Sequence, residues 1–124
     1  MLKTLWPVKV VFSTGLLVAL VAAGFASQGE QLTFTGEIMD SLCAKDGSHN
    51  KMMDQMKSMG RDNQTCTQKC IQLGGKYVLY DPKTKTVYKI DDQDKAARFA
   101  GHKVEIKGTV DKKKITITDI ESGD

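Results

Sequence analysis

The sequence is poor in aromatic residues and carries no large excess of charge of either sign. Aromatic side chains make up 6% of the 124 residues, and 18 basic residues face 15 acidic ones. A nucleic-acid-binding protein needs a strongly basic field, so this balance excludes nucleic acid as a partner. Phosphate-binding loops and dinucleotide fingerprints are absent as well. No recognisable motif places a nucleophile beside either histidine, and the sequence therefore offers no support for an enzyme.

Charge is entirely lacking from residues 10–26, which follow a short segment containing Lys3 and Lys9. A positive start, an apolar stretch and small residues before Ala26 are typical of a secretory signal peptide. We therefore predict that residues 1–26 are removed and that residues 27–124 form one exported domain, either periplasmic or secreted. The alternative is a retained membrane anchor, although 17 residues are few for a span that needs about 20.

Cysteine is scarce, with three in the chain, Cys43, Cys66 and Cys70, all in the predicted mature domain. An odd number in an oxidising compartment leaves either one bridge and one free thiol, or a shared set of metal ligands. The remaining 98 residues are enough for a single hydrophobic core.

Alternating apolar and polar residues predict five strands. The first spans residues 32–39, where Gly36 falls on the apolar face and indicates a bend or a close backbone approach. Residues 76–81 and 86–90 form a hairpin around the Asp81-Pro82 turn. Residues 103–110 and 114–121 close the chain, and the apolar pattern slips between Ile117 and Ile120, where we expect a bulge or a strand end. The lysines at 112–114 fall in the last turn, where we expect them to be solvated.

Helical patterns occupy the segment between the first two strands, residues 40–75. His49 and four methionines recur at helical spacing up to Met59, and Gly60 interrupts the pattern. A second helix starts at an Asp62 or Asn63 cap and ends at Gly74. A short helix capped by Asp91 or Asp92 is expected between the third and fourth strands.

This order predicts an α+β domain that is mainly β: a five-stranded OB-like barrel with a helical hairpin inserted between strands 1 and 2. Three segments, 36–43, 66–71 and 75–79, resemble small exported bacterial proteins of unknown function with an OB-like fold. The resemblance covers most of residues 34–120, supports the fold and the export, and implies no activity and no site residues.

The three cysteines are the strongest chemical feature. Cys66 and Cys70 share one helix face about 5–6 Å apart, too far for the 3.5–4.5 Å that a disulfide requires between its Cβ atoms. Our first prediction is therefore one disulfide between Cys43 and either of them. The second is a soft-metal site, most plausibly for copper, because thiolates and thioethers select Cu(I). Its candidate ligands are Cys43, Cys66, Cys70, His49, Met52 and Met56.

Tyrosines on the central strands supply a candidate ligand face, made of Tyr77, Tyr80 and Tyr88. The leading functional prediction is a non-catalytic, exported binding module with one disulfide, whose partner is a protein, peptide or glycan. The alternatives are an extracytoplasmic copper-binding protein and a thiol-dependent redox protein. The redox alternative lacks the Cys-x-x-Cys spacing of thioredoxin-like enzymes.

Overall fold

A computed structural model describes Gly24 and residues 29–124 of the chain. The predicted signal peptide lies largely outside these residues. Among the described residues no helix has the length and apolar character needed to cross a membrane.

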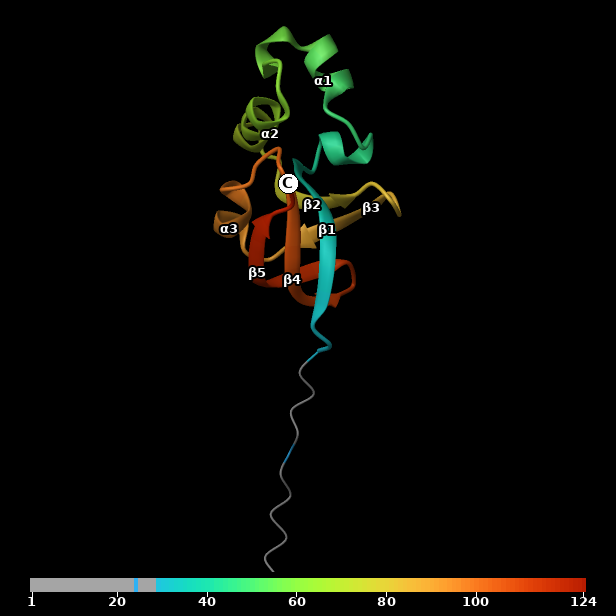
Figure 1. Ribbon diagram of the computed structural model, residues 1–124. Helices are drawn as coiled ribbons and strands as arrows, with labels where there is room; N and C mark the ends of the chain where they lie inside the picture. Colours follow the sequence, from blue (N-terminus) through green and yellow to red (C-terminus); the bar gives the residue numbers. More distant parts are fainter. Residues whose placement is uncertain (1–23, 25–28) are drawn as a thin grey trace, which may run out of the picture.

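Within residues 29–124, five strands and three α-helices follow one another in a mixed α+β arrangement (Figure 1). The elements are β1 (Leu32–Asp40), η1 (Cys43–Lys45), α1 (Asn50–Gln55), η2 (Lys57–Met59), α2 (Asn63–Gln72), β2 (Tyr77–Asp81), β3 (Thr86–Ile90), α3 (Gln93–Ala97), β4 (Lys103–Asp111) and β5 (Lys114–Ser122), where η marks a 3-10 turn. All five predicted strands are confirmed, within one residue at each end.

The strands form one sheet in the order β1-β2-β3-β5-β4, and β4 pairs again with β1, so that the sheet closes into a ring. Every pairing is antiparallel except that of β3 with β5. Between β4 and β5 the register shifts, because Lys107 pairs with Asp119 whereas Gly108 pairs with Ile117. Thr118 is thus the extra residue of a bulge, which confirms the irregularity expected between Ile117 and Ile120.

The predicted close approach at Gly36 is confirmed. A Cβ atom at this position would lie 2.2 Å from the backbone oxygen of Tyr80 on the neighbouring strand β2. Only glycine lets β1 come this near to β2 here.

In the described part of the chain the buried hydrophobic residues form two clusters on opposite faces of β1 and β2. The first fills the ring and contains Ile38, Leu79 and Ile106, among others. The second lies between the sheet and the helical segment 41–75, and it contains Met39, Val78 and the three cysteines. Figure 1 shows this helical segment, in green, as a separate layer beyond one end of the sheet.

The helical segment differs in part from the prediction. Instead of one helix running from His49 to Met59, α1 ends at Gln55 and Met56 adopts an extended backbone before the turn η2. The second helix agrees with the prediction, because the Asp62 side chain accepts the backbone N–H of Thr65 and so caps α2.

Candidate metal centre

The three cysteine side chains lie together in the second core cluster. Cys43 begins η1 just after β1, whereas Cys66 and Cys70 stand one turn apart on α2. Their sulfur atoms all lie within 4.8 Å of one another. None is more than 2% exposed, and all three are free thiols in this structure.

Asp40 turns the chain so that Cys43 faces α2. Its Oδ1 accepts the backbone N–H groups of Leu42 at 3.0 Å and Cys43 at 2.8 Å, which bends the chain sharply at the end of β1. A carboxylate with a short side chain is suited to this turn, because its oxygen can reach the backbone two and three residues ahead. Asp40 itself is fully buried, directly beside the sulfur atoms.

His49 and Asp40 form a second group around Cys43. One ligand atom from each of the three residues lies within 4.8 Å of the other two. His49 Nε2 is 3.0 Å from Glu37 Oε1, and its Nδ1 is 3.9 Å from Asp40 Oδ2. These last two atoms are buried and have no hydrogen-bond partner. Leaving such an atom unpaired costs about 1–3 kcal/mol, so the pair marks a place where a ligand would be stabilising.

Burial keeps the thiols protonated. It raises the pKa of Cys43 strongly, and the negative charge of Asp40 adds to the effect. The same two causes raise the pKa of Cys70 to about 12. The pKa of Cys66 is raised as well, chiefly by burial. At neutral pH the cluster therefore holds three neutral thiols, and a cation must displace protons to bind there.

The structure separates the methionines into two groups. Met39 and Met59 are buried in the cluster with the cysteines, and Met52 and Met53 pack against it. Met56, one of the predicted ligands, is 43% exposed and lies outside the cluster. The break in the helix at Met56 accounts for this exposure, because Met56 no longer lies on the helix face that the sequence predicted for it.

The predicted tyrosine face is divided by the structure. Tyr77 and Tyr88 pack against the core inside the ring, and the ring of Tyr88 meets that of Phe34 edge-on at 5.3 Å. Tyr80 lies on the opposite side, against the cluster of cysteines and methionines. The three side chains therefore do not form one surface.

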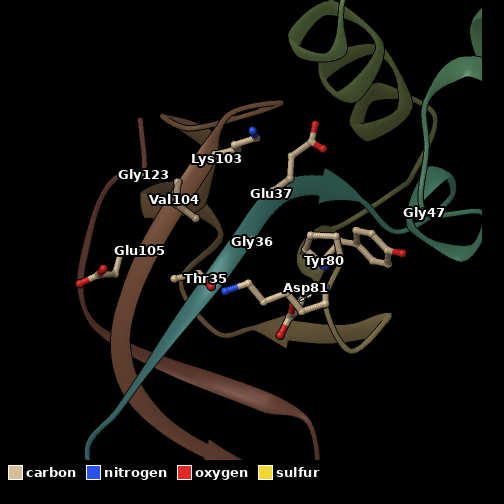
Figure 2. Close-up of a pocket in the computed structure, with 12 residues that line it drawn as sticks. Thr35, Gly36, Glu37, Gly47, Tyr80, Asp81, Lys103, Val104, Glu105 and Gly123 are labelled. Atoms are coloured by element: carbon tan, nitrogen blue, oxygen red, sulfur yellow. Dashed lines mark hydrogen bonds between the residues drawn. The ribbon is translucent and has the colours of Figure 1, made fainter.

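An open hollow of about 450 Å³ lies beside the cysteine cluster. Figure 2 shows it between β1, β2 and β4, with the Tyr80 ring reaching toward Gly47. Glu37 lines this hollow and also contacts His49, so the hollow is connected to Cys43 through two side chains. Asn63 Nδ2 donates a hydrogen bond of 3.0 Å to the same carboxylate and fixes its position.

Sequence reasoning missed Asp40, Glu37 and Met39 as neighbours of the sulfur atoms. Its position after the first strand is typical of a turn residue, and Asp40 does make the turn, but nothing in the sequence indicated its complete burial. One signal was available in the sequence. The first strand ends in two large apolar residues in succession, Ile38 and Met39, and a cysteine follows Asp40 by three residues. A strand end exposed to water on one face would alternate apolar and polar residues instead.

Comparison with protein-family models, curated proteins and solved structures finds no match for this chain.

Proposed function

We propose that this protein binds a thiophilic metal ion, Cu(I), through Cys43, Cys66 and Cys70. The observation that carries the proposal is the gathering of three buried sulfur atoms within 4.8 Å of one another, from two separate elements of the chain. We rank the metal site above the disulfide, because all three sulfurs, and not one pair alone, lie within 4.8 Å of one another.

The spacing suits a three-coordinate ion. With metal–sulfur bonds of about 2.3 Å, sulfurs placed at the corners of a triangle lie about 4.0 Å apart. That separation falls within the observed limit of 4.8 Å, so small side-chain rotations bring the thiols onto one ion. Met39 and Met59 add soft thioether surroundings, which favour Cu(I) over harder cations.

Asp40 and His49 stand next to this site in a supporting role. Asp40 Oδ2 and His49 Nδ1 have no hydrogen-bond partner and lie near Cys43, while the other ring nitrogen of His49 contacts Glu37. Metal-bound groups are commonly oriented by a second layer of carboxylates and imidazoles. Asp40 and His49 would supply that layer, and His49 Nδ1 would serve as a further ligand for an ion that prefers four.

The experiment is a metal titration of the reduced, metal-free protein. Cu(I) is delivered from a competing chelator, and bound copper is counted by elemental analysis. We expect one Cu(I) per chain and copper–sulfur distances in the X-ray absorption spectrum. Cys66→Ser and Cys70→Ser should lose most of the affinity, whereas the matched exposed variant Met56→Leu should retain it. A protein that binds no more copper than Cys66→Ser would contradict the proposal.

A disulfide between Cys43 and one helix cysteine is the competing use of the same sulfurs, and it belongs to the alternative of a non-catalytic binding module. Mass measurement after alkylation without reduction distinguishes the two. Three modified thiols support the metal site, and one modified thiol supports the module. Thiol–disulfide catalysis is disfavoured, because buried thiols with raised pKa values are poor nucleophiles.

We further propose that the domain is OB-like and works outside the cytoplasm. The order of the strands, the parallel pairing of β3 with β5, and the helix between β3 and β4 support the OB-like assignment. The charge pattern of residues 1–26 supports export to the periplasm or the medium.

A further inference from the structure

A second hollow, far richer in positive charge, lies at the β4–β5 turn. Its volume is about 720 Å³, within the range of about 300–1,000 Å³ that small-molecule sites occupy. Five lysines line it and no acidic residue does: Lys76, Lys89, Lys112, Lys113 and Lys114. Its apolar lining comes from Tyr77, Val78, Val87 and Ile90.

The lysines have no neutralising partners within the described part of the chain. None of the five takes part in a salt bridge among residues 29–124. Lys89 of β3 is paired in register with Lys114 of β5, which sets two like charges on neighbouring strands. Like charges on neighbouring strands repel each other, and a bound anion would relieve this repulsion.

The turn itself is unfavourable for lysine. Lys112 and Lys113 both have positive φ, 46° and 59°, in a two-residue connection between β4 and β5. Asn-Gly is the sequence that such turns favour, because both central residues adopt a left-handed backbone. Lysine at both positions therefore carries a backbone cost that Asn-Gly would not.

We propose that this hollow binds a single-chain anionic amphiphile with a phosphate head. The head would contact the ring of lysine ammonium groups, which bind phosphate as point charges. The hydrocarbon chain would lie against Tyr77 and Val87, the two partly exposed apolar side chains of the lining. This site is separate from the cysteine cluster, and it does not depend on the proposed metal.

The structure provides a matched pair of variants. Lys113→Gly removes one lysine from the hollow and relieves a positive φ of 59°. Lys85→Gly makes the same change of charge at a positive φ of 53°, but Lys85 does not line the hollow. Both variants should raise the melting temperature, because glycine adopts this backbone without strain.

The probe is dodecyl phosphate below its micelle concentration, measured by isothermal titration calorimetry. We expect one molecule bound per chain, weaker binding of inorganic phosphate, and no binding of dodecyltrimethylammonium. Lys113→Gly should weaken binding by about threefold to fivefold, the value of one exposed ion pair. The double variant Lys112→Asn/Lys113→Gly should weaken it further, and Lys85→Gly should leave it unchanged.

Three results would overturn the inference. Equal losses in Lys113→Gly and Lys85→Gly would show a non-specific charge effect. Binding to phosphatidylglycerol vesicles with none to dodecyl phosphate would assign the lysines to a membrane surface. An absence of dodecyl phosphate binding to a protein that is folded, as judged by circular dichroism, would exclude the site.

Discussion

At the scale of a single residue, Cys70 shows how the cluster changes the ionisation of a thiol. It is completely buried, and burial, followed by the negative charge of Asp40, raises the pKa of its thiol, while a contact with Cys43 acts weakly in the opposite direction. The folded protein therefore binds the Cys70 proton more tightly than the unfolded chain does. The pKa rises from its ordinary value of 9.0 to about 12 on folding.

This difference makes the metal-free protein sensitive to alkali. Because the folded pKa is raised, the stabilisation is complete below pH 9, the unfolded value, and is lost as pH rises toward 12. We expect the free energy of unfolding, from urea titrations of reduced protein, to fall across this range. Cys70→Ser cannot ionise there, so its stability should fall less steeply between pH 9 and 11. Parallel slopes for the two proteins would contradict the assigned burial effect.

Strand β1 shows how one element serves both cores. Ile38 faces the interior of the ring, while its neighbour Met39 faces the cysteine cluster, and both are fully buried. The strand ends in Asp40, whose side chain starts the turn to Cys43. Any displacement of β1 therefore disturbs the core of the sheet and the position of the first sulfur together.

Gly36→Ala tests this coupling. The added Cβ would meet the Tyr80 backbone oxygen at 2.2 Å, and the backbone of β2 cannot yield as a flexible side chain would. Overpacking of this kind costs about 1–3 kcal/mol, which thermal unfolding would detect. Gly29→Ala is the matched control, because its nearest contact would be 3.5 Å away. An equal stability of the two variants would show that β1 moves away freely.

The elements that sequence alone predicted well are those whose pattern is local. Alternation indicated the five strands, a slip in the alternation indicated a bulge or a strand end where the bulge at Thr118 lies, and Asp62 or Asn63 indicated the start of α2. The broken helix at Met56 was not foreseen, since helical spacing continues through a residue whose backbone is extended. Whether a helix continues through such a residue depends on tertiary packing, and local periodicity carries no information about that packing.

The same distinction applies to the cysteine cluster. The i, i+4 spacing placed Cys66 and Cys70 on one face, but the approach of Cys43 depends on the turn made by Asp40. The His49–Glu37 contact joins residues twelve apart, across the join between a strand and a helix. Such pairs follow from the fold, so no spacing rule could have selected Glu37.

At the scale of the whole molecule, the cysteines are the link between the two layers. Cys43 follows directly from the sheet, whereas Cys66 and Cys70 belong to the helical layer drawn in green in Figure 1. Besides these sulfurs, the helical layer is anchored by Met59 and by the hydrogen bonds of His49 and Asn63 to Glu37 of β1, whereas α1 has no buried residue. A metal ion bound to all three thiols would therefore cross-link the helical layer to the sheet.

Hydrogen exchange should detect this cross-link through the protection of backbone amides in the helical layer. Bound Cu(I) stabilises the states in which all three sulfurs are together, so opening of the helical layer should become rarer. We expect exchange to slow across residues 43–72 when Cu(I) is added, with little change in the β4–β5 hairpin, which already has its own ladder of strand pairs. In Cys43→Ser the added ion can hold only the two sulfurs of α2, and the protection of residues 43–59 should disappear while the hairpin is unaffected. Uniform slowing over the whole chain would instead mean that the ion stabilises the domain globally, and that the helical layer does not open independently of the sheet.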